Sequence, residues 1–225
     1  MNVISSALSS NELQVAPAGL NDVTTMGCGS TANENAFKAC FVAWMDRYRN
    51  GSPPTQEELD SCMLNQEPGC PKLSILSFWG AFHGRTLGCL ATTRSKPVHK
   101  LDIPHFDWPM APFPQLWYPL DQYADRNAEE ERRCLEVTRE IFEQKCNSDS
   151  PIAGCIVEPI QVRDFGARKA QNRQFGFEIH SSIWSQAEGG DNGASPDYFR
   201  KLRALVKEYE AYFIVDEVQT GGGVR

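Results

Sequence analysis

Residues 195–218 read SPDYFRKLRALVKEYEAYFIVDEV, and this stretch indicates the fold class. Ser195 and Pro196 are typical of the N-cap and first position of a helix, and apolar residues then recur at helical spacing as far as Tyr209. The helix leads directly into an apolar run that Asp216 closes. Because a helix is followed so closely by a fully apolar strand, we predict an α/β fold whose mostly parallel sheet is buried on both faces.

Two earlier apolar runs belong to the same predicted sheet. Residues 74–78 (SILSF) predict a strand followed by a glycine-bracketed turn and a short helix, and residues 153–160 (AGCIVEPI) predict another strand. Ligands of parallel sheets bind beyond the carboxyl ends of the strands. We therefore expect residues 27–30, Glu158 and Asp216 to gather at one edge of the sheet.

A glycine turn precedes the first long helix. Residues 23–26 predict a short strand and residues 27–30 (GCGS) a turn. Thr31 followed by Glu34 predicts a capping box that would start the helix just after the glycines. Free N–H groups at such a helix start could bind a single phosphate. The alternative is a plain strand-to-helix turn, which the spacing alone favours.

The remaining segments predict two more helices and an irregular stretch. A short helix is expected from Thr55 and a longer one over residues 127–146. The Pro-rich residues 97–122 predict an ordered irregular segment that packs on a surface.

Composition excludes several classes of protein. Hydrophobic residues make up 41% and charged residues 23% of the 225 residues, which excludes collagen-like, coiled-coil and disordered chains. The net charge of −7 argues against nucleic-acid partners, and no apolar run is long enough to span a membrane. The N-terminus has the pattern of neither a signal peptide nor a transit peptide, and eight irregularly spaced cysteines indicate reduced thiols. We expect an intracellular protein, in the cytoplasm in preference to the mitochondrial matrix.

Two features carry candidate chemistry. Residues 80–85 (GAFHGR) place an aromatic ring, an imidazole and a guanidinium between two glycines, which suits a flat cofactor and a carboxylate. The alternative is a core Phe beside a solvated His and Arg. Asp216 closes an apolar strand, so its desolvated charge requires a cationic partner, either a protonated ring nitrogen or a nearby Lys or Arg.

Six motifs spread along the chain share one family resemblance. They are GCGSTANENAFK (27–38), SFWGAFHGRTLGCLATT (77–93), KLDIPHFDWPMAPFP (100–114), AGCIVEPIQ (153–161), EGGDNGASPDYFRKLR (188–203) and FIVDEVQTGGG (213–223). Together they resemble the 4-aminobutyrate (GABA) aminotransferases, pyridoxal-phosphate enzymes of class III and fold type I. The resemblance implies transfer of an amino group from 4-aminobutyrate to 2-oxoglutarate, giving succinate semialdehyde and glutamate, by a homodimer. A class III aminotransferase acting on ornithine or acetylornithine, or a non-catalytic remnant, is the alternative.

The resemblance also implies roles for individual residues. The positions that match cofactor-binding residues are Gly29, Ser30, Phe82, His83, Asp216, Val218 and Gln219. The positions that match substrate-binding residues are Arg85, Glu158 and Glu188. By this match, Gly29 and Ser30 would bind the cofactor phosphate, and Phe82 would stack on the pyridine ring. Asp216 would keep the ring nitrogen protonated, and Arg85 would hold the substrate carboxylate.

Three features depart from the family pattern. The lysine that forms the Schiff base matches no position here, so we expect it beyond Arg225 and expect the chain as given to be inactive. Cys28 matches an iron–sulfur ligand, but Thr31 stands where the second cysteine would be, so we expect no cluster. We interpret residues 1–225 as part of a cofactor-binding large domain. Within it, residues 162–186 have no family counterpart, and we interpret them as a retained intron, with an extra loop as the alternative.

Overall fold

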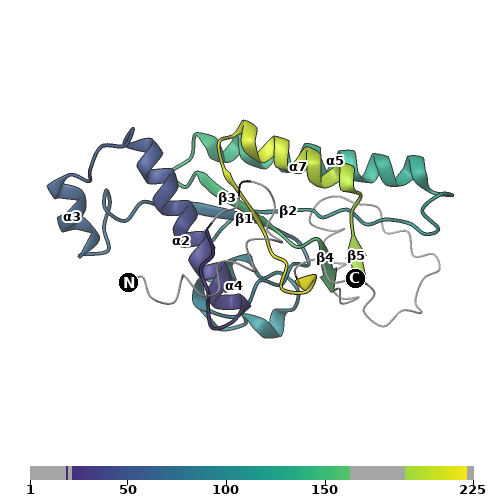
Figure 1. The fold of residues 1–225 in the computed structure, drawn as a ribbon, viewed down its shortest axis with the longest axis horizontal. Coiled ribbons are helices and arrows are strands. Elements are labelled where there is room, and N and C mark those ends of the chain that lie inside the picture. Colours follow the sequence, from purple (N-terminus) through teal and green to yellow (C-terminus); the bar gives the residue numbers. More distant parts are fainter. Residues whose placement is uncertain (1–18, 20–21, 163–190, 222–225) are drawn as a thin grey trace.

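The computed structural model describes residue 19, residues 22–162 and residues 191–221. Within this part of the chain, a four-stranded sheet lies at the centre, with strand order β2-β1-β3-β6 and parallel pairing throughout (Figure 1). Its strands are β1 (Ser74–Phe78), β2 (Met110–Ala111), β3 (Ile152–Val157) and β6 (Tyr212–Val215). A separate antiparallel pair joins β4 (Ile160–Val162) to β5 (Asp191–Gly193). The predicted α/β fold with a mostly parallel sheet is confirmed.

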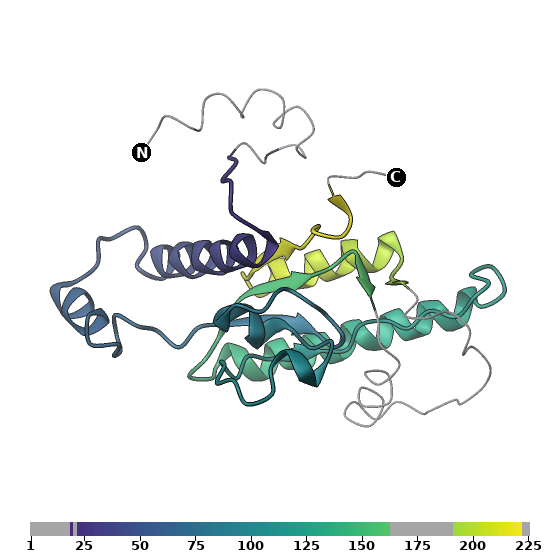
Figure 2. The same ribbon diagram turned by 90° about the horizontal axis from the view of Figure 1, so that it is seen from below.

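Helices cover both faces of the sheet, as Figures 1 and 2 show. One face is covered by α5 (Ala124–Cys146) and α7 (Pro196–Glu208), the other by α2 (Gly29–Tyr48) and α4 (Leu87–Thr92). The short helix α3 (Gln56–Cys62) extends away from the sheet beyond the far end of α2, and η1 (Pro97–His99) is a single 3-10 turn. The core is therefore built in three layers.

Alternate residues of each strand enter different halves of the core. Leu76, Phe78 and Val157 pack against α5 and α7, whereas Ile75 and Ile156 pack against α2 and α4. All five side chains are fully buried. This alternation follows from the two-residue period of a strand, and because both faces are covered, β1 and β3 are buried along their whole length.

The register of the sheet brings the carboxyl ends of distant strands together. Val157 of β3 pairs with Val215 of β6, so Glu158 and Asp216 follow at the same level of neighbouring strands. The Asp216 N–H donates to the carbonyl of Val157 at 2.9 Å, which extends the ladder by one residue. The predicted gathering of these carboxylates at one edge is thus confirmed.

Several sequence-based boundaries are wrong. Residues 23–26 form no strand, and the predicted helix over 127–146 begins three residues earlier, at Ala124. The first helix begins at Gly29, because Cys28 is its N-cap and shares a capping box with Thr31. Thr31 is therefore the third residue of the helix and leaves Glu34 to bond elsewhere. The strand predicted over 153–160 ends at Val157, where the chain turns toward β4.

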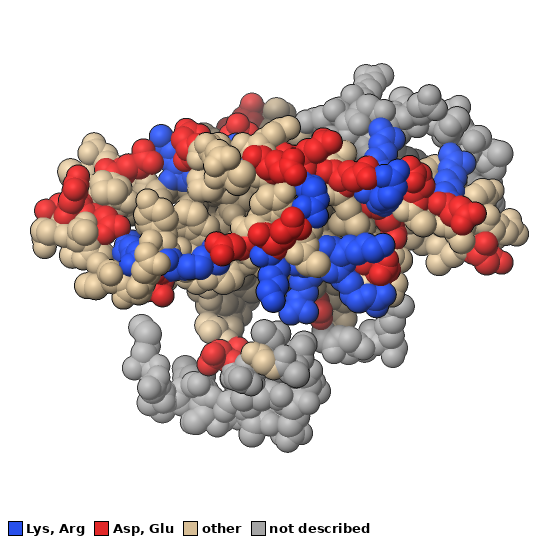
Figure 3. Space-filling model, turned by 90° about the horizontal axis from the view of Figure 1, so that it is seen from above, with Lys and Arg blue, Asp and Glu red and all other residues tan. Residues whose placement is uncertain are grey.

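The outer surface of α5 and α7 carries both signs of charge. Figure 3 shows Lys and Arg intermingled with Asp and Glu across this face. Arg139 of α5 forms a two-pronged pair with Glu208 of α7 at 2.6 and 3.0 Å, and Lys201 pairs with Asp197 at 2.6 Å. In the described ranges, no helix combines the length and apolarity that a membrane crossing requires.

Candidate functional site

The start of α2 forms one wall of the site. This helix runs for 20 residues from Gly29 and has no acidic side chain in its first turn, so the N–H groups and positive dipole end at its start suit an anion. A Cβ at Gly29 would lie 2.6 Å from Cγ2 of Val218, and one at Gly84 would lie 2.3 Å from Oγ of Ser30. The side chains of Val218 and Ser30 pack this closely against positions 29 and 84 only because both positions are glycine.

The loop after β1 crosses in front of this helix start. The Phe82 N–H donates to Oε2 of Glu158 at 3.0 Å, and the His83 N–H donates to the hydroxyl of Thr93 at 3.1 Å. That hydroxyl in turn donates to the Gly84 carbonyl at 2.7 Å. Phe82 is 38% exposed although its neighbours are buried, so the fixed backbone presents its ring outward.

Asp216 is the most strongly held carboxylate of the site. Its Oδ2 lies 2.8 Å from Nδ1 of His83 and accepts from Nδ2 of Asn33 at 2.9 Å, while its Oδ1 accepts from the Val218 N–H at 3.1 Å. Burial by itself would raise the pKa of Asp216, but these partners, His83 first, lower the pKa below its ordinary value. The side chain is therefore an ionised carboxylate at the carboxyl end of β6.

Glu158 lies at the same edge but has the opposite electrostatic character. It is 5% exposed, and burial raises its pKa to about 8; the Phe82 N–H opposes this shift and the charge of Asp216 adds to it. Two carboxylates on neighbouring strands are thus driven apart in pKa, one ionised and one predominantly protonated at neutral pH. Such divergence is typical of functional sites.

Cys28 lies at the rim of this site, exposed at the N-cap of α2. Its pKa is lowered, chiefly by the backbone N–H of Thr31. The Thr31 hydroxyl bonds to the carbonyl of Cys28 at 2.9 Å and occupies the position where a second cysteine would be needed. Among the described residues, no three His, Cys, Asp or Glu side chains are grouped to hold a metal ion. The expected absence of a cluster stays a prediction.

The remaining predicted residues are placed as follows. Arg85 and Gln219 are exposed, as is Val218. The ring of Phe82 meets the ring of His99 edge-on, with centroids 5.1 Å apart. Glu188 lies outside the described residues. Of the stretch 162–186, only Val162 is described.

Sequence reasoning missed three residues of the site: Asn33, Glu34 and Thr93. Asn33 is buried and donates through one amide nitrogen to both Asp216 and the His83 carbonyl, each at 2.9 Å. A signal was present, because Asn33 precedes Phe37 by four positions and thus continues the buried stripe of α2. A polar residue on such a stripe requires a buried partner.

Comparison with known proteins shows the family of this chain. A family model described as aminotransferase class III matches residues 3–172 and 184–225. The chain belongs to the class III aminotransferase family. The match is interrupted over residues 173–183, within the stretch that has no counterpart in the sequence motifs.

Individual relatives share up to half of their aligned residues with this class III chain. The mitochondrial 4-aminobutyrate aminotransferase of Sus scrofa is 50% identical over 211 residues, and that of Homo sapiens is 49% identical over the same length. Each alignment covers 94% of this chain and 37% of the relative, so the chain spans just over a third of their length. A lysine aminotransferase structure from M. tuberculosis matches with 30% identity and a TM-score of 0.58, over 88% of this chain and 35% of that one.

Proposed function

We propose that this chain forms the cofactor-binding part of a pyridoxal-phosphate enzyme that moves an amino group from 4-aminobutyrate to 2-oxoglutarate. The observation that carries the proposal is Asp216, a buried ionised carboxylate that His83 and Asn33 fix at the carboxyl end of a central strand. The identity of about 50% to 4-aminobutyrate aminotransferases, against 30% to the lysine aminotransferase, favours 4-aminobutyrate as the donor.

The residues present fit pyridoxal phosphate. Nε2 of His83 is buried and has no hydrogen-bond partner among the described residues, which leaves a polar atom to be satisfied beside Asp216. The start of α2 offers N–H groups to a phosphate, and the outward ring of Phe82 offers a flat apolar face. The donor set therefore matches an anion at one end and a cationic ring nitrogen at the other.

When bound, pyridoxal phosphate supplies an electron sink through which an amine donor and a keto acceptor exchange their amino group. Asp216 would hold the proton on the ring nitrogen, because its depressed pKa makes it an anion at neutral pH. Gly29 and Ser30 would bind the phosphate through backbone N–H groups, and Phe82 and Val218 would enclose the ring. Gln219 would bond to the oxygen on the ring, and Arg85 would bind the carboxylate of the substrate.

A finer proposal concerns assembly. We propose a homodimer, supported by exposed apolar side chains on the Pro-rich segment, among them Val98, Leu101 and Phe106, which are 57 to 79% exposed. The expected preference for the cytoplasm has no support among the relatives, since the Sus scrofa and Homo sapiens proteins are mitochondrial.

The role of Arg85 provides the direct test. In an enzyme of the relatives' full length that carries this segment (the full-length enzyme), we expect Arg85→Ala to raise KM for 4-aminobutyrate by roughly 10- to 100-fold, because a charged hydrogen-bond partner of the substrate is lost. The dissociation constant of pyridoxal phosphate should stay within about twofold. Arg200→Ala, an exposed arginine on α7, is the control.

Equal weakening of substrate and cofactor in Arg85→Ala would assign Arg85 a structural role instead. A second measurement compares donors, and kcat/KM should be higher for 4-aminobutyrate than for ornithine or lysine. The reverse order would place the enzyme in another branch of the family.

A further inference from the structure

Glu34, on the first turns of α2, caps a different helix. Its Oε1 accepts from the Gly88 N–H at 2.9 Å, from the Cys89 N–H at 3.1 Å, and from the hydroxyl of Thr86. Thr86 is the N-cap residue of α4, but its own side chain makes no capping bond. A carboxylate that lies more than 50 positions earlier in the chain therefore satisfies the N–H groups that a helix start leaves unpaired.

The fit between Glu34 and α4 is close. A Cβ at Gly88 would lie 2.5 Å from Oε2 of Glu34, so position 88 admits only glycine while the carboxylate stays in place. The Cys89 thiol also donates to the Ser30 carbonyl at 3.3 Å, which joins the same turn of α4 to the start of α2. Glu34 thus fixes α4 against the helix end that would bind the phosphate.

Arg85 lies between two anchored points of the backbone. On one side, His83 is held by Asp216, and the Gly84 carbonyl is bonded to Thr93. On the other side, Thr86 is held by Glu34. Both flanks of the exposed arginine are therefore fixed, and the Glu34 contacts fix the second flank.

We propose that Glu34 is a positioning residue that sets the place of the Arg85 guanidinium relative to the anion site at the start of α2. The inference rests on the proposed function, in which Arg85 binds the substrate carboxylate. Without the Glu34 cap, the turn at Thr86 is free to shift, and the two anion-binding points lose their fixed separation. A small misplacement of a positioning group is enough to lower substrate affinity by a factor of ten or more.

Glu131 offers a matched control. This glutamate of α5 accepts from the N–H of Ser195 at 2.6 Å and from its hydroxyl at 2.7 Å, and so supports the start of α7. Its chemistry is the same as that of Glu34, a carboxylate from one helix that supports another helix start, but its partners do not belong to the site. A variant at Glu131 therefore shows the effect of losing a helix cap on general stability, without any displacement of Arg85.

The test compares Glu34→Ala, Glu34→Gln and Glu131→Ala in the full-length enzyme, by kinetics, cofactor titration and amide hydrogen exchange over residues 80–92. We expect Glu34→Ala to raise KM for 4-aminobutyrate about tenfold and to speed exchange at Gly88 and Cys89, with cofactor affinity within about twofold. Glu34→Gln should restore both readouts, because its amide oxygen accepts the same bonds. Glu131→Ala should leave both unchanged.

The proposal is overturned if Glu34→Ala changes neither readout, if Glu34→Gln behaves like Glu34→Ala, or if Glu131→Ala raises KM equally. Should Glu34→Ala fail to fold, Thr86→Val removes one of the three bonds and should shift KM and exchange in the same direction by less. If the unaltered enzyme does not use 4-aminobutyrate, the proposed function fails, whereas exchange at Gly88 and Cys89 still decides whether Glu34 fixes this turn.

Discussion

The two edges of the sheet, at opposite ends of its strands, differ in the burial of their charged side chains. At the carboxyl ends, Asp216 and Glu158 are 5% exposed and their pKa values move in opposite directions. At the amino ends, Arg47 and Glu210 form an ion pair whose side chains are 41% and 75% exposed. The difference shows that burial and specific hydrogen-bond partners, and not the presence of charged residues as such, shift the pKa values at one edge.

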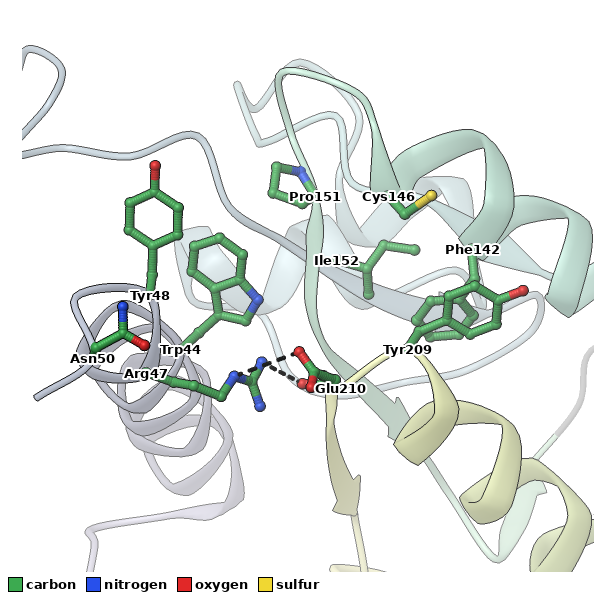
Figure 4. Close-up of a pocket in the computed structure, with 10 residues that line it drawn as sticks. All are labelled: Trp44, Arg47, Tyr48, Asn50, Phe142, Cys146, Pro151, Ile152, Tyr209 and Glu210. Carbon is green, nitrogen blue, oxygen red and sulfur yellow. Dashed lines mark hydrogen bonds and ion pairs between the residues drawn. The ribbon is translucent and has the colours of Figure 1, made fainter.

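The amino-terminal edge has a cavity of its own, of about 390 Å³ (Figure 4). Two stacked aromatic pairs stand on either side of Ile152, namely Trp44 with Tyr48 at 5.5 Å and Phe142 with Tyr209 at 5.0 Å between centroids. The guanidinium of Arg47 donates to the Glu210 carbonyl and lies over the ring of Tyr212. This edge is thus a hollow with aromatic walls, in which Arg47 and Glu210 are already paired with each other.

The largest expected effect that separates the two edges comes from Asp216→Asn. A neutral amide cannot hold the cofactor ring nitrogen protonated, so we expect kcat of the full-length enzyme to fall about 100-fold or more while pyridoxal phosphate stays bound. Steady-state kinetics and the absorbance of the bound cofactor measure the two effects. Asp197→Asn, at an exposed ion pair of α7, is the control. A loss below about threefold would contradict the role given to Asp216.

A smaller effect is expected from pH. The folded-state pKa of Glu158 is raised to about 8 from an ordinary 4.5, so its contribution to stability is complete below about pH 4.5 and is lost as pH rises toward 8. Because of this group, the free energy of unfolding of the 225-residue chain should therefore decrease by up to about 1.4 kcal/mol for each unit by which pH rises in this range.

The pH effect is measured by urea unfolding of the parent chain and of Glu158→Gln between pH 5 and 8. The variant should lack that component of the slope. Asp216 contributes with the opposite sign, because its pKa is lowered, and its stabilisation is lost as pH falls below the ordinary aspartate range. If both proteins show the same pH dependence, Glu158 does not have the raised pKa.

The smallest effect is expected at the other edge. Arg47→Ala removes an exposed ion pair and a ring contact to Tyr212, so the free energy of unfolding should fall by about 1 kcal/mol or less. Cofactor affinity and kcat of the full-length enzyme should not change. A loss of cofactor binding in this variant would mean that the two edges are coupled, and would contradict their separate roles.

Local patterns predict the elements well, and distant pairings poorly. The strand over 74–78 and the Ser195 N-cap of α7 are confirmed, because a short buried run bounded by turn residues and a capping pattern both depend on neighbours within a few positions. β6 is as apolar as β3, yet its residues are only partly buried because it lies at the edge of the described sheet. Position in a sheet is set by other strands and leaves no trace in the strand itself.

The same reasoning separates the predicted site residues from the missed ones. Asp216 is conspicuous in sequence because a charge ends an apolar run, and the family resemblance names its role. Asn33 and Glu34 are ordinary helical residues, and their importance comes from partners 50 or more positions away. The sequence pattern moreover predicts a capping box between Thr31 and Glu34, whereas in the structure Cys28 forms the capping box with Thr31.

The bonds that join Asp216 to Asn33 and His83 span 183 and 133 positions of the chain. Contacts of such long range form late, since a large loop must close before they contribute. During synthesis at about 5–20 residues per second, Asn33 would wait roughly 10–40 s for Asp216 to emerge. The amide of Asn33 and the imidazole of His83 must stay hydrated or find other partners over that interval. The hydrogen bonds of the site therefore form only after β6 has paired with β3, so a complete site reports that this part of the sheet has folded.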